Sequence, residues 1–409
     1  MSLNSRLQSL LGGESADTAI VIADPLVQAE QVQDVAIAEA EADINAVETE
    51  IVQTQNDMEV LEERVEELEE KIDGVESMLN GTRSWNPELA QSFYDSARKV
   101  ISKTFGDAHA PSVKGAECFS DKDNAQLELH AGLLGMKEKA GEIWGHVKQF
   151  FINLYNSIIN FFRGLFNRFR GIEGKAQALK SRVDAAADDK IKKEIKLGGW
   201  NAFIDAEKSK GKPSINAGIT AVAKLSVDLG GDAFKLASNT RDTLSSFASS
   251  GDQKKSEGAN DNNETIQFKE GGIDFTVVIP VSSPKDEAAA LGATKASYKV
   301  SKDGVKTSGT LSSSQNKAGL SSIVTAVLAD AKKAQVDGFS ESKLKTKRDA
   351  AIASIEVAAR GTDADAKETK KKVAITRNGH NAALRVAGVL TRYNGDVLTA
   401  QLAYVGAHL

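Results

Sequence analysis

The chain has 409 residues, of which 41% are hydrophobic, 26% charged and 6% aromatic. These values are typical of soluble proteins with buried cores, and they exclude collagen-like and multi-span membrane proteins. A single cysteine, Cys118, excludes an internal disulfide bond. We therefore expect the protein to be made in a reducing compartment.

The net charge of −6 is distributed unevenly along the chain. Residues 1–117 carry 24 acidic and 8 basic residues, a net charge of −16, whereas residues 118–409 carry 33 acidic and 43 basic residues, a net charge of +10. Such a split indicates that one part of a chain meets nucleic acid or another highly charged body. An acidic, solvated helix attached to an ordinary domain is the other interpretation.

A flexible acidic lead is predicted for residues 1–34, and a coiled coil for residues 35–80. In the coiled-coil segment, apolar residues recur at alternating spacings of three and four, interrupted only at Thr54, which is the heptad pattern. Asn80-Gly81 provides the stop signal. The seam residues are Ile44, Val47, Ile51, Met58, Leu61, Val65, Leu68, Ile72, Val75 and Leu79.

The heptad pattern leaves two pairings open for this seam. A parallel pair with a second copy predicts that residues 44–79 drive self-association. An antiparallel hairpin with a later helix of the same chain buries the same side chains. The spacing is identical in both cases.

A helical body is predicted for residues 81–248, and residues 142–170 form its amphipathic helix. Asparagine, glutamine and arginine interrupt this segment, so it has no apolar run long enough to span a bilayer. Its apolar face predicts burial against protein, and an interfacial membrane helix is the alternative, with arginines 163, 168 and 170 as the membrane-facing cations. The apolar face contains Trp144, Val147, Phe151, Leu154, Tyr155, Ile158, Phe162, Leu165, Phe166 and Phe169.

The second half of the chain changes pattern twice. Residues 249–264 are polar and are predicted to be a linker. Residues 265–312 alternate apolar and polar side chains around Gly271-Gly272 and Asp303-Gly304, which predicts two hairpins of a small antiparallel sheet. Residues 313–409 return to a helical period. The predicted fold class is mainly α (α+β): an N-terminal coiled coil, a helical body and a small β insertion.

No residue constellation typical of catalysis is present. The five histidines are far apart, Cys118 has no accompanying motif, and no metal-binding or phosphate-binding loop is complete. We therefore predict no catalytic residues, no cofactor and no metal site. The protein is expected to act by binding.

Four segments together carry a resemblance to a known family. They are the opening MSLNSRLQSLLG, the glutamate-rich coiled coil, the stretch WGHVKQFFINLYNSIINFFRGLFNRFRGIEGKAQAL, and ALRVAGVLTRYNGDVLTAQLAY near the end. This arrangement resembles the internal head (inner body) proteins of giant phiKZ-like tailed phages. The resemblance implies a virion structural protein that is made in the host cytoplasm and packaged inside the capsid, with phage head proteins and, non-specifically, packaged DNA as partners.

In that family, acidic N-terminal segments are removed by a maturation protease that cuts after glutamate. The resemblance therefore implies that the acidic arm is a propeptide. Gly115-Ala116-Glu117 fits the cleavage pattern and is favoured because it lies where the acidic part of the chain meets the basic part. The same pattern also fits Glu14, Glu76, Glu142, Glu173, Glu356 and Glu368. Removal of the arm would leave a body of charge +10, which would attract DNA. A membrane-active amphipathic protein and an enzyme of unrecognised type are the alternative functions.

Overall fold

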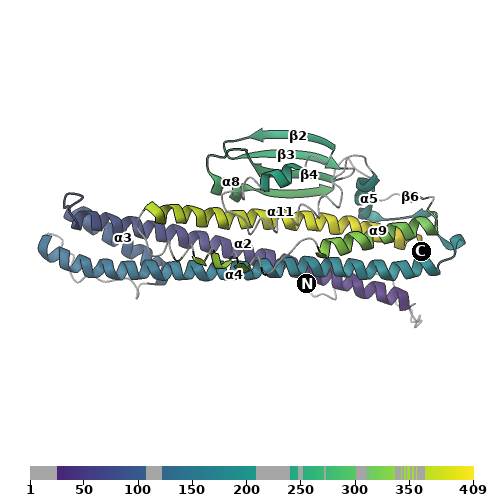
Figure 1. Ribbon diagram of the computed structural model, residues 1–409, viewed down its shortest axis with the longest axis horizontal. Helices are drawn as coiled ribbons and strands as arrows, with labels where there is room; N and C mark the ends of the chain where they lie inside the picture. The colour runs from purple at the N-terminus through teal and green to yellow at the C-terminus, as the bar shows by residue number, and fades with distance from the viewer. Residues whose placement is uncertain are drawn as a thin grey trace, which may run out of the picture.

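Three long helices run along the length of the molecule (Figure 1): α2 (Pro25–Leu79), α4 (Lys122–Ala185) and α11 (Ala364–His408). The computed structural model describes residues 25–106, 122–208, 240–246, 252–270, 273–300, 311–313, 315–336 and 364–409, with short stretches between 342 and 356. Helix α2 begins inside the predicted flexible lead, so that boundary was wrong. Pro25 suits the first turn of a helix because its missing N–H has no partner to lose there.

Helices α2 and α4 form an antiparallel hairpin. Trp144 of α4 donates a hydrogen bond to Glu69, and further along the pair Lys175 meets Asp34. A Cβ on Gly171 of α4 would lie 2.7 Å from the side chain of Ile37, so glycine permits the close approach of the helices here. The intrachain antiparallel alternative is therefore the arrangement that the structure has.

The predicted seam lies inside this hairpin. The side chains of Ile51, Met58, Val65, Leu68 and Ile72 are at most 3% exposed, and Leu61 is half-buried. The seam's apolar surface is thus covered by helices of the same chain. Removal of this surface from water is the main contribution that α2 makes to stability.

Helix α3 (Pro87–Phe105) folds back on the end of α2. Gly81 takes a φ of 76°, which L side chains rarely adopt, and so turns the chain where the Asn80-Gly81 signal predicted. Asn86 then caps α3 by accepting a hydrogen bond from the Leu89 N–H, with Pro87 in the first turn.

The predicted amphipathic segment is the middle of α4. Its apolar face lies in the core, where Trp144, Phe151, Tyr155, Phe162 and Phe169 are at most 3% exposed and Phe166 is half-buried. Helix α11 covers part of this face, with the rings of Tyr155 and His380 in edge contact at 5.0 Å. Helix α9 (Lys317–Val336) packs against the C-terminal half of α4.

A four-stranded antiparallel sheet lies against α11 (Figure 1). Its order is β2 (Asp252–Ala259), β3 (Asn263–Glu270), β4 (Ile273–Pro280) and β5 (Lys295–Val300), and α8 (Glu287–Ala293) connects the last two strands. The alternation that predicted β3 and β4 is confirmed, because the odd-numbered residues of β4 from 273 to 279 are buried. Phe275 meets Tyr393 of α11 at a ring distance of 4.8 Å, which joins the sheet to the helices.

The linker predicted at residues 249–264 was wrong. Strand β2 and the start of β3 occupy most of it. The sequence of β2 has few apolar residues, and the strand pairs with β3 in an antiparallel register.

A second, two-stranded sheet ties together distant parts of the chain. Strand β1 (Glu194–Ile195) pairs with β6 (Leu311–Ser312) soon after the C-terminal end of α4, and the short helix α5 (Asn201–Lys208) that follows packs against α11. The predicted helical body therefore contains a strand. The predicted Asp303-Gly304 turn lies outside the described residues.

Candidate functional site: a buried ion-pair network

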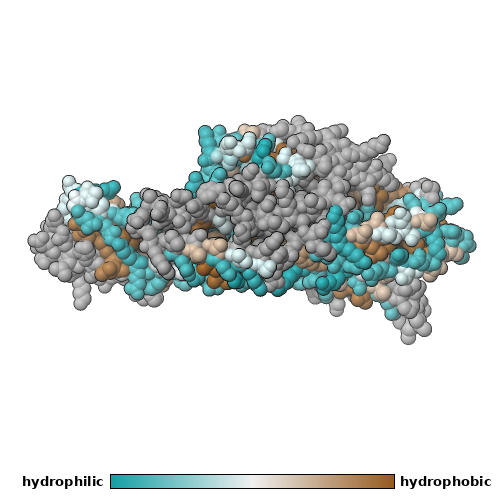
Figure 2. All heavy atoms as spheres, in the orientation of Figure 1, coloured by the Kyte–Doolittle hydropathy of each residue, from teal (hydrophilic) through white to brown (hydrophobic). Residues whose placement is uncertain are grey.

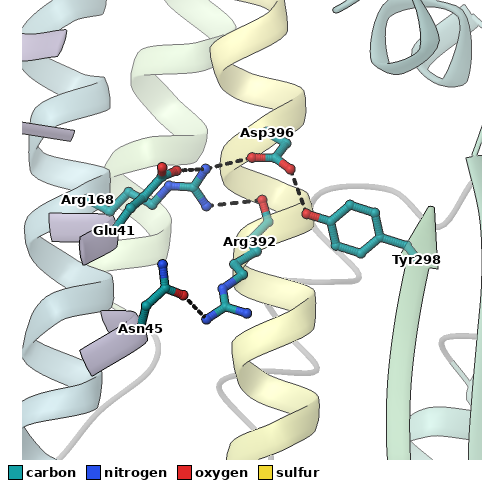
Figure 3. A network of polar contacts seen from close by, with 6 residues as sticks. All are labelled: Glu41, Asn45, Arg168, Tyr298, Arg392 and Asp396. Atoms are coloured by element: carbon teal, nitrogen blue, oxygen red, sulfur yellow. Dashed lines mark hydrogen bonds and ion pairs between the residues drawn. The ribbon is translucent and has the colours of Figure 1, made fainter. Parts of the chain in front are cut away.

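Arg168 is a charged side chain in the middle of the core. It extends from α4 and is 2% exposed at its side chain, between α2 and α11 (Figure 3). Its Nη2 lies 2.6 Å from Oε1 of Glu41 on α2 and 2.7 Å from Oδ1 of Asp396 on α11. Its Nη1 donates a hydrogen bond to the Arg392 carbonyl oxygen at 3.1 Å. One guanidinium therefore holds three helices in a single register.

The network continues from the helices into the sheet. Tyr298 of β5 donates its hydroxyl proton to Oδ2 of Asp396 at 2.6 Å (Figure 3). Burial, together with the neighbouring Asp396 carboxylate, raises the pKa of Tyr298 above its usual range, so the hydroxyl remains a donor. At the other end, Arg392 donates to Oδ1 of Asn45 at 2.7 Å and pairs with Glu48.

Gly395 of α11 provides the space for Arg168. A Cβ at position 395 would lie 2.5 Å from Cζ of Arg168, and the three bonds of the guanidinium prevent it from moving aside. We expect Gly395→Ala to lower the free energy of unfolding by about 1–3 kcal/mol, although alanine is the better helix former. Urea denaturation measures the change.

Gly145→Ala on α4 is the matched control for this substitution, because an added Cβ meets nothing within 4 Å there. It should stabilise the protein by up to about 1 kcal/mol. Equal effects of the two substitutions would contradict the tight fit of Arg168 against Gly395.

A series of ion pairs joins acidic α2 to the basic helices. Glu30 pairs with Arg182 and Lys175 near one end of α2, and Glu76 pairs with Lys137 at 2.5 Å near the other. On the α11 side, Arg377 pairs with Glu62. The charge split seen in the sequence is thus matched within the chain, because carboxylates of residues 1–117 meet cations of residues 118–409.

Glu62 is the carboxyl group most affected by this packing. Burial raises its pKa from 4.5 to about 7, opposed by Arg377 and assisted by Glu66 and Glu59. The folded chain therefore binds a proton at Glu62 at pH values where the unfolded chain has released it. Through this group, the free energy of unfolding falls as pH rises from about 4.5 to about 7.

We expect Glu62→Gln to remove this dependence on pH. Urea denaturation between about pH 4.5 and pH 8 should show a flatter stability profile for the variant than for the wild type. Glu63→Gln, at the exposed neighbouring position, should leave the profile unchanged. If the stability profile of Glu62→Gln is as steep as that of the wild type, Glu62 titrates at its ordinary pKa and the expectation is wrong.

The predicted site residues lie in different places from this network. The seam and the amphipathic face form the core around it, and Glu117 lies outside the described residues. Arg168, which the membrane alternative would place among the lipid-facing cations, is buried in the core. A signal was present, because Arg168 stands between Leu165, Phe169 and Ile172 on the apolar stripe, where an arginine needs a buried partner.

The network has a structural role, since each of its charged groups forms an ion pair or a hydrogen bond with another group of the chain. In the part of the chain that the structure describes, no group of three histidine, cysteine or acidic side chains is placed to hold a metal ion. Among those same residues, no helix combines the length and apolar character needed to cross a membrane.

Comparison with known proteins identifies the family. The family model for phiKZ-like phage internal head proteins matches residues 39–407. This match includes the sheet, which carried none of the resemblance seen in the sequence. No curated protein and no solved structure matches the chain. Because the family model covers nearly the whole chain, the chain belongs to the phiKZ-like phage internal head proteins and is a virion structural protein of the head interior.

Proposed function

We propose that the protein serves the head interior as a preformed rod whose opposite charges neutralise each other within one chain. The observation that supports this most directly is the series of α2 carboxylates on cations of α4 and α11. Because both partners belong to one chain, neutralisation requires no other molecule. Mutual engagement of Arg168, Asp396 and Tyr298 supports a structural rather than an enzymatic role.

We further propose that contact with packaged DNA is weak and non-specific. Cations such as Arg168, Lys175 and Arg377, at most 10% exposed at their side chains, are held by carboxylates. A phosphate would have to displace carboxylates that the fold already holds in place. The exposed lysines remain for non-specific contact, with an affinity that falls as salt rises.

The family resemblance implies a cut after Glu117. A propeptide would leave the protein after such a cut, but the contacts of α2 favour a different result. Position 117 lies in the chain between α3 and α4. The buried seam of α2 and its ion pairs do not depend on that covalent connection. We propose that residues 1–117 stay bound after the cut, so that no free body of charge +10 is released.

Cutting the purified full-length protein tests this proposal. Residues Gly115, Ala116 and Glu117 are replaced with the recognition sequence of a specific protease, and the cut product is examined by gel filtration and by titration with duplex DNA. We expect both fragments to elute together and the DNA affinity to equal that of the same variant before cutting.

Gel filtration of the cut protein in urea gives the elution positions of the two separated fragments, with which the elution without urea is compared. If fragment 1–117 elutes apart from the body without denaturant, and the body then binds DNA strongly at about 50 mM salt and weakly at about 200 mM, the propeptide interpretation is correct and the proposed permanent arm is wrong.

The membrane-active alternative requires the apolar face of residues 142–170 to leave the core, where Phe151 and Phe162 are at most 1% exposed. We propose that this face remains with protein. Liposome flotation with anionic vesicles should therefore leave the intact protein in the unbound fraction.

A further inference from the structure

The outward face of α4 carries a polar stripe that none of the ion pairs described above explains. Its spacings alternate between three and four residues, so the stripe stays on one side of α4 over about 36 Å and drifts around the helix by only about 20° per heptad. All eight side chains are exposed. They are His146, Gln149, Asn153, Asn156, Asn160, Arg163, Asn167 and Arg170, and we call them the amide stripe.

The composition of the amide stripe is unusual for an exposed helix face. It has no lysine and no acidic residue, and α4 has no acidic residue at all between Glu142 and Glu173. Solvated helix faces are usually rich in Lys and Glu, whereas protein interfaces are depleted of both and enriched in Arg. Half-buried Phe150, Ile152 and Phe166 lie on the neighbouring positions and add apolar surface. The composition therefore indicates a contact surface.

The hydrogen-bonding chemistry of the stripe is self-complementary, because each amide side chain both donates and accepts. Within the stripe, Gln149 donates to Asn153 at 3.1 Å and Arg163 donates to Asn160 at 3.5 Å. Each of these two bonds uses one donor of the first side chain and one acceptor of the second. Further amide donors and acceptors of the stripe face outward.

We propose that the amide stripe is the surface on which a second copy of this chain docks, with the two α4 helices antiparallel. A two-fold axis next to position 158 places the stripe on itself. Position 156 then faces position 160 of the other copy, 153 faces 163 and 149 faces 167. These three pairs each combine an amide with an amide or an arginine, and His146 faces Arg170 at the two ends of the contact, so no acidic pair opposes another.

The surroundings favour this occupant over nucleic acid. Glu50 of α2 lies beside the stripe, since Ser157 of α4 donates to its Oε1 at 3.1 Å. Asp43 and Asp57 are exposed and lie one heptad to either side of Glu50, on the same face of α2. This row of carboxylates repels phosphates but leaves an amide-to-amide contact unaffected. Figure 2 shows hydrophilic side chains interspersed with hydrophobic ones along the lower edge of the molecule, where α4 runs.

Charge substitutions at the central pair test both the docking and its register. In Asn156→Lys/Asn160→Lys, lysine faces lysine in the antiparallel pair. In Asn156→Lys/Asn160→Glu, lysine faces glutamate. Sedimentation equilibrium from about 1 µM to about 1 mM covers the range expected for a small, polar interface. We expect the wild type and the Lys/Glu variant to approach twice the monomer mass, and the Lys/Lys variant to stay monomeric.

The matched control is Gln28→Lys/Gln31→Lys, which changes two exposed amides near the N-terminal end of α2, beyond the end of the amide stripe. It should associate as the wild type does, and thermal unfolding should confirm that all variants fold. A wild type that remains monomeric up to about 1 mM overturns the proposal, as does a Lys/Lys variant that still dimerises. The variant Asn156→Glu/Asn160→Glu tests the nucleic-acid alternative. If its mass in sedimentation equals that of the wild type but it no longer binds DNA, the stripe is a nucleic-acid surface and the proposal is wrong.

Discussion

Arg168→Met is expected to lower the free energy of unfolding by about 3 kcal/mol, because it leaves the carboxylates of Glu41 and Asp396 without their cation. Breaking a buried ion pair by removing one partner typically costs about 3–5 kcal/mol. The lower end applies because the side chain of Glu41 is 45% exposed and water can solvate it, whereas that of Asp396 is only 23% exposed. Urea denaturation monitored by circular dichroism provides the measurement.

Two further variants separate the charge effect from simple loss of arginine. Arg98→Met, at an exposed position on α3, should change stability by no more than about 0.5 kcal/mol. The double variant Arg168→Met/Asp396→Asn should be less destabilised than the sum of its single variants, because the uncompensated charge at Asp396 is gone. Additive effects would mean that Arg168 contributes by packing alone.

Leu68→Ala is expected to lower the free energy of unfolding by about 2–5 kcal/mol, the cost of a cavity in a close-packed core. Leu68 is 0% exposed within a single chain, so Leu68→Asp should unfold the chain rather than dissociate an oligomer. Leu134→Ala, at a side chain that is 69% exposed, is the control and should be close to neutral.

Sedimentation of the aspartate variant distinguishes this outcome from pairing of the seam with a second copy. If the seam paired two chains, Leu68→Asp would give a folded monomer. This monomer would have the circular dichroism of the native protein and half the mass of the wild-type dimer. An unfolded chain at every concentration agrees with the intrachain hairpin.

Local sequence determined most of the elements of this protein. The heptad spacing around Met58 and Val65 predicted a long helix with a buried seam, and Asn80-Gly81 predicted its end, because both signals act over a few residues. The alternation from Ile273 to Ile279 predicted a half-buried strand for the same reason. Strand β2 has no such local signal in its sequence, and only its pairing with β3 identifies it as a strand.

The tertiary structure decided which surfaces these elements meet. A seam of period 3.5 looks the same whether it pairs with a second copy or with a helix of the same chain, and only the fold back of α4 along α2 resolves this. The charge split indicated a charged partner, but the contact of Glu30 with Arg182 crosses 152 residues, a distance at which sequence spacing carries no information. Arg168 likewise meets Asp396 only through packing of the helices, because electrostatic pairing acts through space and not along the chain.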